Sequence, residues 1–258
     1  MPDMLEEHIR SRVNEKGIAL MAHIVCGYPS FEANWEILEE MESAGVDVVE
    51  MQFPFSEPIA DGPLFLKANQ ESLDKGTKLA DCFGFMKKAS ERFSFAVLMM
   101  GYYNTVFKTG EQEFCRRLKA EGGCGLIVPD LPPEEDSELA EACDKLDMAL
   151  IRLVAPTNTG ERIEQIVKRG RGFIYAVARK GVTGKQTRFS NDMEDYLSNL
   201  KKISSVPIAV GFGISQKADI DYLRGKADMA VTGTAVLTSY LLNGRCGVKE
   251  FFASLGAG

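Results

Sequence analysis

The chain has 258 residues, of which 45% are hydrophobic and 26% are charged, and its formal net charge is −7. This composition is typical of a globular protein, and the acidic balance argues against nucleic acid and anionic membranes as main partners. The longest apolar run, at residues 95–100, is as long as a strand and too short for a membrane span. Six scattered cysteines without a C-x-x-C pair predict reduced thiols and a cytoplasmic location, and the two histidines predict neither a histidine zinc site nor a Ser-His-Asp triad.

Short apolar runs alternate along the chain with longer charged stretches that have helical periodicity. The runs lie at residues 19–26, 46–51, 95–101, 125–130, 148–154, 172–178, 207–213 and 228–233. They are almost continuously apolar, which indicates strands buried on both faces of a parallel sheet. Repeated strand-then-helix units over about 250 residues predict an α/β fold in which residues 1–258 form a single (βα)8 TIM barrel.

Three segments fall outside this regular repeat. Residues 1–16 are predicted to form an extra helix that covers the N-terminal end of the barrel. The connections after the second and sixth strands, from about residue 52 and over residues 179–195, are too long for simple turns, and long loops of this kind are often lids or binding segments. A doubly wound open sheet is the competing architecture, but the segment "CGYPSFEAN" after the first strand lacks its Gly-rich fingerprint.

Two carboxylates are expected at the mouth of this barrel. Glu50 ends the second strand and shares one strand face with Val48, so it is predicted to point into the mouth, where partial burial raises a carboxyl pKa toward the range useful in acid-base catalysis. Asp61, in "IADGP", lies in a turn that can fold over the same mouth. The alternatives are a solvated rim residue for Glu50 and a turn former for Asp61, while Glu57 is predicted to be a surface residue.

The last two predicted strands end in glycines, in "VGFGIS" and "VTGTAV". In (βα)8 enzymes the loops after strands seven and eight often hold a phosphate through backbone N–H groups and a helix N-terminus. Gly213, Gly233 and Thr234 are therefore predicted to bind phosphate, with Gly184 of the sixth loop as a further donor. The alternative is that these glycines only mark tight strand-to-helix turns.

The segment "VVEMQFPFSEPIADGP" resembles the signature of tryptophan synthase α-subunits, in which a strand-end Glu is followed by P-F-S-D-P-x-A-D-G-P. The resemblance covers nearly the whole chain and includes the blocks "GYYN", "VPDLPPEE", "APTN", "ARKGVTG" and "GFGIS". It implies retro-aldol cleavage of indole-3-glycerol phosphate to indole and glyceraldehyde 3-phosphate in tryptophan biosynthesis, without a cofactor in this subunit. It also implies an α2β2 heterotetramer in which indole passes to a pyridoxal-phosphate (PLP) β-subunit.

The resemblance also implies roles for individual residues. Glu50 would transfer protons at indole C3 and at the glycerol hydroxyl, and Asp61 would accept the indole N–H. The other residues implied are Tyr175 as a third catalytic residue beside the reacting carbons, Met100, Tyr102 and Phe212 around the indole, Thr183 as an anchor of the sixth loop on Asp61, and Gly184, Gly213, Gly233 and Thr234 at the phosphate. No metal is implied.

This sequence departs from the family pattern near the expected site. His23 and Cys26 stand on the first strand where the family has an aromatic and small residues, Gln52 replaces a Gly, Glu57 replaces an Asp, and residues 64–69 read "LFLKAN". Two other functions are therefore considered. One is a different phosphate-handling barrel enzyme, such as an isomerase or epimerase, and the other is a weakly catalytic subunit that serves as an allosteric partner. The two retained carboxylates argue against both.

Overall fold

The computed structural model describes residues 4–177, 191–211 and 213–256. Its parallel strands close into a barrel in sequence order, with β1 paired to both β2 and β8. The strands are β1 (Ala19–Val25), β2 (Val48–Gln52), β3 (Ala96–Met100), β4 (Gly125–Ile127), β5 (Ala149–Val154), β6 (Ile174–Val177), β7 (Ile208–Gly211) and β8 (Met229–Thr232). Each strand lies largely within one of the predicted apolar runs, and the expected (βα)8 barrel is confirmed.

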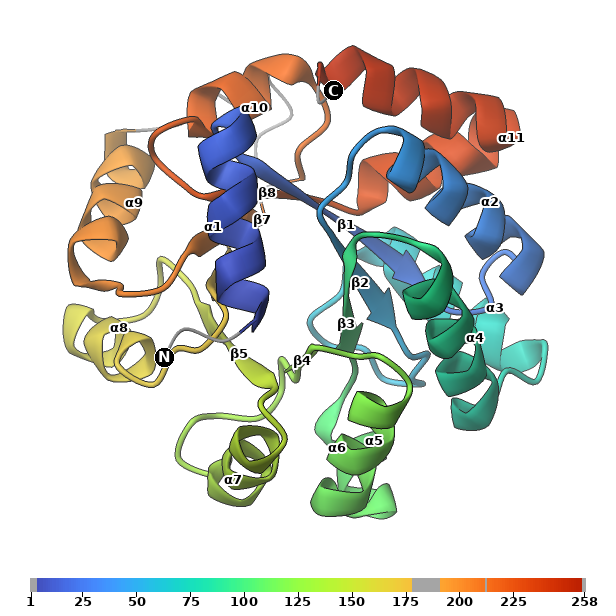
Figure 1. The fold of residues 1–258 in the computed structure, drawn as a ribbon, viewed down its shortest axis with the longest axis horizontal. Helices are drawn as coiled ribbons and strands as arrows, with labels where there is room; N and C mark the ends of the chain where they lie inside the picture. Colours follow the sequence, from blue (N-terminus) through green and yellow to red (C-terminus); the bar gives the residue numbers. More distant parts are fainter. Residues whose placement is uncertain (1–3, 178–190, 212, 257–258) are drawn as a thin grey trace.

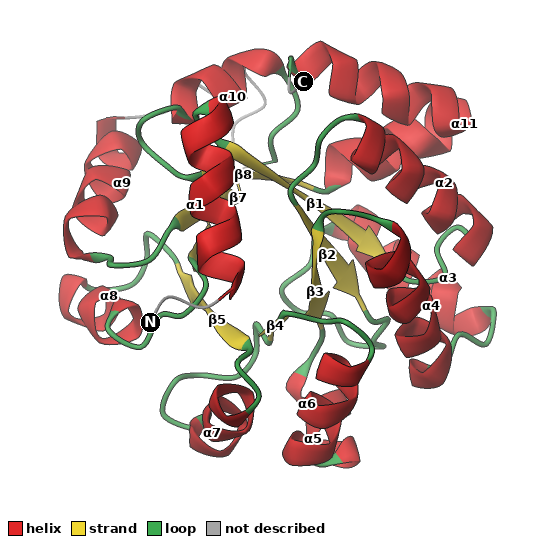
Figure 2. Cartoon of the chain, in the orientation of Figure 1, coloured by secondary structure: helices red, strands yellow, loops and turns green. Residues whose placement is uncertain are grey.

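All the described helices except the first surround the strands as an outer layer (Figures 1 and 2). The helices are α1 (Met4–Lys16), α2 (Phe31–Ser43), α3 (Pro63–Asp74), α4 (Leu79–Arg92), α5 (Tyr103–Thr109), α6 (Glu111–Ala120), α7 (Ser137–Lys145), α8 (Gly160–Val167), α9 (Asn191–Ile203), α10 (Lys217–Leu223) and α11 (Thr234–Leu255). A pair of helices follows β2 and another pair follows β3. In the described ranges, no helix combines the length and the apolarity needed to cross a bilayer.

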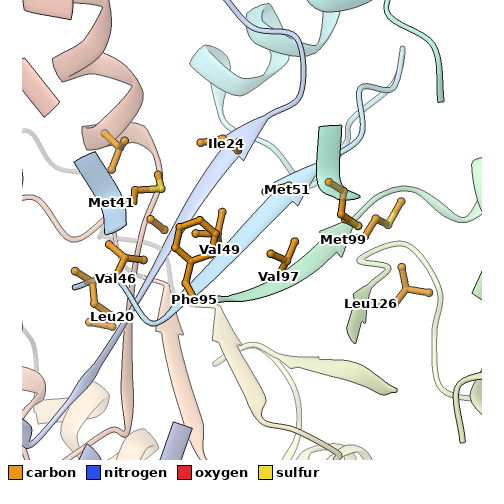
Figure 3. Close-up of a cluster of buried hydrophobic side chains, with 14 of the residues drawn as sticks. Leu20, Ile24, Met41, Val46, Val49, Met51, Phe95, Val97, Met99 and Leu126 are labelled. Carbon is orange, nitrogen blue, oxygen red and sulfur yellow. The ribbon is translucent and has the colours of Figure 1, made fainter. Parts of the chain in front are cut away.

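Strand side chains alternate between an inner and an outer core. Val48 and Leu98 point into the barrel and belong to the interior cluster, whereas Val49 and its outward-facing neighbours pack against the helices. Figure 3 shows this outer layer around β1, β2 and β3, where Val97 lies on the same outward face and Met41 approaches from α2. Burying an aliphatic side chain of this size contributes roughly 1.5–3 kcal/mol to stability, so the alternation fixes which strand face each residue occupies.

Helix α1 closes the barrel at the end where the strands begin, and Figure 1 shows it lying across the strands. Leu5 and Ile9 are buried in the interior cluster, so this helix contributes side chains to the inside of the barrel. Lys16 Nζ lies 2.9 Å from a carboxylate oxygen of Asp47, the residue that precedes β2. Active sites of such barrels lie at the opposite end, where the strands finish. The contacts of α1 therefore serve stability.

Residues 53–62 form the long connection between β2 and α3. The backbone N–H of Phe55 donates a hydrogen bond to Asn69 Oδ1 at 2.9 Å, and that of Ala60 donates to Tyr102 Oη at 3.0 Å. The Phe55 ring also stacks on the Tyr102 ring with centroids 5.0 Å apart. These contacts attach the connection to α3 and to the segment after β3, and hold it near the ends of the strands.

Candidate active site

A cavity of about 450 Å³ lies where the strands end. It brings together several predicted site residues that are distant in the sequence. These residues are Glu50 on β2, Asp61 in the connection after it, Met100 on β3, Tyr175 on β6, Gly213 after β7, and Gly233 and Thr234 after β8. The remaining lining is His23, Ala60, Gly62, Phe65, Ile127, Pro129, Leu153, Val154, Ala155, Asn158, Val177, Gly211 and Val231. The predicted carboxylates and the predicted phosphate loops thus share one cavity.

Glu50 faces this cavity from the end of β2 and is only 3% exposed. Its neighbour in the parallel register is His23 on β1, whose Nδ1 lies 4.0 Å from Glu50 Oε2. Burial, with a smaller contribution from the negative charge of Asp61, raises the pKa of Glu50 to about 8. The Glu50 carboxyl is therefore protonated at neutral pH and can give up a proton and take one back during a reaction.

Asp61 is half-buried, lines the same cavity and is surrounded by donors. Gln52 Nε2 donates to Asp61 Oδ2 at 2.6 Å, and Asn69 Nδ2 donates to the same oxygen at 3.3 Å. Burial raises the pKa of Asp61, while hydrogen bonds from Gln52, Tyr102 and Asn69 oppose that rise. Glu50 is thereby favoured as the proton donor and Asp61 as the ionised acceptor, which is the usual way in which two carboxylates take different roles.

Tyr175 lies on β6 and lines the cavity that Glu50 and Asp61 also line. A Cβ atom on Gly211 would come within 2.8 Å of the Tyr175 ring, so the glycine on β7 leaves the space that this ring fills. Burial, followed by the charges of Glu50 and Asp61, raises the Tyr175 pKa well above its ordinary value. The phenol therefore stays neutral and is a hydrogen-bond donor at the cavity.

Tyr102 is expected to line the indole pocket. It is 1% exposed, and it is not itself among the described residues that line the cavity. Its phenol oxygen accepts a hydrogen bond from the backbone N–H of Ala60 in the connection after β2, and its hydroxyl also interacts with Asp61, so it contacts two residues that do line the cavity. Tyr102 thus supports that connection, and Met100, two residues earlier, lines the cavity itself.

The loops after β7 and β8 form the glycine-rich side of the cavity. Gly213 has φ of +63°, a left-handed conformation that favours glycine. A Cβ on Gly233 would lie 3.1 Å from both His23 Cβ and Phe65 Cζ, so this position also favours a residue without a side chain. Thr234 begins α11, whose free N–H groups and positive dipole end favour an anion. Phe212, Thr183 and Gly184, also predicted at the site, lie outside the described residues.

Comparison with known proteins identifies the family to which this arrangement belongs. The family model for the tryptophan synthase alpha chain matches residues 9–244. The chain belongs to the tryptophan synthase alpha chain family. It is 48% identical over 251 residues to the tryptophan synthase alpha chain of Desulfotalea psychrophila, with 97% of this chain and 99% of the relative covered. It is 44% identical over 252 residues to that of Syntrophotalea carbinolica, with 98% and 100% covered.

Solved tryptophan synthase structures have the same fold. A chain of the enzyme from Mycobacterium tuberculosis superposes with a TM-score of 0.90 at 31% identity, and the match covers 100% of this chain and 98% of that one. A chain of the tryptophan synthase α2β2 complex from Pyrococcus furiosus superposes with a TM-score of 0.87 at 28% identity, covering 93% and 98%. The expected membership of the tryptophan synthase α-subunit family is therefore confirmed, together with its barrel.

From the sequence, His23 and Phe65 have no predicted role at the site, although both line the cavity of this family member. Their rings stack with centroids 4.4 Å apart, and burial lowers the pKa of His23 to about 3, so the imidazole is neutral. The strand register contained a usable signal, because His23 pairs with Glu50. No such signal exists for Phe65, because its position depends on how α3 packs. Within the described ranges, no three His, Cys, Asp or Glu side chains gather as a metal site would require.

The buried Glu50 carboxyl predicts that stability falls as the pH rises. Its pKa is about 8 in the folded protein against an ordinary value of 4.5, so between these values the folded state binds more protons than the unfolded state. The free energy of unfolding should therefore fall from about pH 4.5 through about pH 8. Glu50→Gln should remove this loss and be more stable than wild type above pH 8, by on the order of 1–3 kcal/mol.

Urea unfolding between pH 5 and pH 9 measures this difference. The control is Glu57→Gln, which makes the same change at an exposed position of the adjacent connection and should retain the wild-type dependence on pH. If the free energies of unfolding of wild type and Glu50→Gln change in parallel with pH, the pKa of Glu50 in the folded protein is not raised as its burial predicts.

Proposed function

We propose that the chain is the α-subunit of a tryptophan synthase and acts as a carbon-carbon lyase in tryptophan biosynthesis. In this proposal it cleaves indole-3-glycerol phosphate by a retro-aldol reaction to indole and glyceraldehyde 3-phosphate. The observation that carries the proposal is that a protonated carboxyl, Glu50, and a hydrogen-bonded carboxyl, Asp61, line one cavity together with the glycine-containing loops after β7 and β8. Membership of the tryptophan synthase alpha chain family supports it.

The proposed reaction begins with proton transfer to the indole ring. The Glu50 carboxyl, protonated at neutral pH, gives its proton to indole C3, and the ring becomes a cation with its charge largely on the N–H. Asp61 accepts a hydrogen bond from that N–H and stabilises the charge, which is greatest after the proton has moved. Glu50 is left as a buried carboxylate, and the high pKa of its site makes it a strong base for the following step.

The second step breaks the carbon-carbon bond. Glu50 removes the proton from the glycerol hydroxyl next to the ring, and that oxygen forms the carbonyl of glyceraldehyde 3-phosphate. The electron pair of the broken bond returns to the ring and neutralises it, so indole leaves with the new hydrogen on C3. Glu50 ends protonated, as it began, so one carboxyl serves as acid and then as base. Tyr175 can donate a hydrogen bond beside the reacting carbons.

Binding of the substrate is assigned to the two sides of the cavity. Met100 contributes to the apolar side that would hold the indole, and Phe212 completes it in the proposal carried over from the family. Gly213, Gly233 and Thr234 would hold the phosphate through backbone N–H groups, and Gly184 would add another. Thr183 would anchor the sixth loop on Asp61. Binding a phosphate away from the reacting carbons supplies energy that can be used to position them.

We also propose how this chain works with its partner. The two proton transfers and the stabilised N–H account for every step above, so the reaction needs no cofactor in this chain, and PLP belongs to the β-subunit that consumes the indole. An α2β2 assembly is supported by the similarity to a chain of the Pyrococcus furiosus α2β2 complex. Ile59, on the connection after β2, and Phe107, on α5, are 80% and 65% exposed and offer apolar surface for contacts with a partner. We place the complex in the cytoplasm and treat residues 1–258 as one domain.

Steady-state assay of indole formation tests this function. The purified chain is incubated with indole-3-glycerol phosphate, alone and with a tryptophan synthase β-subunit, and indole is quantified by chromatography. We expect indole from the chain alone and faster release in the presence of the β-subunit. Absence of indole in both reactions would overturn the proposal. Stimulation of β-subunit activity by a chain that forms no indole would identify an allosteric subunit, and failure to bind the substrate would favour another phosphate-handling enzyme.

A further inference from the structure

Gln52, the last residue of β2, lies beneath the Asp61 carboxylate. Its side chain has no exposed surface, and its Nε2 donates to Asp61 Oδ2 at 2.6 Å. The same nitrogen lies 3.4 Å from Asn69 Oδ1, and Asn69 Nδ2 donates to Asp61 Oδ2 at 3.3 Å and to Phe65 O at 2.8 Å. Two buried amides from β2 and α3 thus meet on one carboxylate oxygen.

The orientation of the Gln52 amide follows from the chemistry of its partner. A carboxylate only accepts hydrogen bonds, so turning Gln52 Oε1 toward Asp61 would bring two acceptors to 2.6 Å. The nitrogen must therefore face Asp61, which leaves Oε1 as the acceptor for other neighbours; a hydrogen bond between Gln52 and His23 partly offsets the effect of burial on the His23 pKa. The buried amide thus presents its donor to the Asp61 carboxylate.

We infer that Gln52 is a positioning residue, which holds the Asp61 carboxylate over the cavity and keeps it in its accepting form. This inference rests on the proposed function, in which Asp61 receives the N–H of the indole ring. Asp61 lies on the connection 53–62, whereas Gln52 belongs to a strand of the barrel. A hydrogen bond to an ionised acceptor is roughly twice as strong as one between neutral groups, so it ties a loop carboxylate to a rigid element.

The groups that face Asp61 decide what happens when the Gln52 donor is removed. Glu50 approaches from β2, Tyr102 from the segment after β3 and Tyr175 from β6, while the two amides of Gln52 and Asn69 are neutral. Burial raises the pKa of Asp61, and the amide donors oppose it. Loss of the shortest of these hydrogen bonds should therefore raise the Asp61 pKa further, and the fraction of ionised Asp61 at a given pH should fall.

The variant that isolates this effect is Gln52→Met, which keeps the length of the side chain and removes its donor. We expect kcat/KM for indole-3-glycerol phosphate at neutral pH to fall by about ten- to a hundredfold. The acid limb of the kcat/KM profile, where Asp61 becomes protonated, should move up by about one pH unit. A residue that only filled space would lower activity without moving that limb. The matched control is Gln70→Met on α3, where an exposed Gln donates to Asp74 at 2.7 Å.

A second measurement separates this inference from the proposed function. The carboxyl carbon of Asp61 is followed by ¹³C NMR as the pH of the ligand-free protein is changed, and the signal is assigned by its loss in Asp61→Asn. A higher midpoint in Gln52→Met than in wild type and Gln70→Met supports the inference, even for a chain that forms no indole. Equal midpoints would overturn it, even in an active enzyme. If Gln52→Met does not fold, Gln52→Leu also removes the amide donor without adding a charge, and it is judged by the same shift.

Discussion

Glu50→Gln should abolish most indole formation, with kcat reduced by about 10²–10⁴-fold, the usual contribution of a general acid-base group. The amide has the shape of the carboxyl but cannot give a proton to indole C3 or take one from the hydroxyl. The KM for indole-3-glycerol phosphate should change little, because the apolar side of the cavity and the glycine loops remain. Steady-state kinetics with quantified indole measures both constants.

The pH dependence of the wild-type rate is an independent test of the role of Glu50. Because the reaction starts from the protonated carboxyl, kcat/KM should fall as the pH rises through about 8, where Glu50 ionises. Asp61 must be ionised, so the rate should also fall toward low pH and the profile should be bell-shaped. Glu57→Gln is the matched control and should retain both rate and profile. Wild-type turnover by Glu50→Gln would remove Glu50 from the mechanism.

Asp136→Ala should lower the free energy of unfolding by about 3–5 kcal/mol, the usual cost of removing one partner from a buried ion pair. Asp136 has no exposed surface, and it pairs with the buried Arg152 of β5 and, at 2.7 Å, with Arg169, which follows α8. Burial, followed by the positive charge of Arg169, lowers the pKa of Arg152 to about 10. Such a loss is a large part of the 5–15 kcal/mol by which a domain of about this size is stable.

Urea unfolding measures this loss, with Asp144→Ala as the control. Asp144 is an exposed carboxylate that pairs with Arg171, and its removal should cost about 1 kcal/mol or less. Replacing the buried pair together, as Asp136→Leu with Arg152→Leu, should recover much of the stability because no buried charge is left alone. Equal losses for Asp136→Ala and Asp144→Ala would contradict the interpretation of Asp136 as a buried ionic link.

The parts of the fold that depend on local pattern could be predicted from the sequence. Continuous apolar runs marked the strands, because strands buried on both faces exclude polar residues. Alternation along residues 48–51 placed Glu50 on the inner face with Val48, and the interior cluster contains Val48 while the outer one contains Val49. The cavity position of Asp61 also followed from local sequence, since a turn beside Gly-Pro lies only a few residues beyond the strand.

Contacts that depend on packing between distant elements could not be predicted in the same way. Tyr102 has the spacing of a pocket residue, but its hydrogen bond with the connection after the neighbouring strand depends on how that connection folds. The stacking of Phe65 on His23 depends on the direction in which α3 leaves that connection. The bond from Gln52 to Asp61 requires the chain to return over its own strand end. Each of these depends on three-dimensional geometry that no spacing in the sequence records.

The position of α1 has a consequence for the route by which a product leaves the cavity. Leu5 and Ile9 pack among the interior side chains at the end where the strands begin, so the barrel is closed there. The cavity lies at the other end, where the strands finish. A small apolar product released inside must therefore leave in the direction from which the substrate came. A protein bound at the open end would receive this product before it reached bulk water, because side chains of α1 and of the strands together fill the opposite end of the barrel.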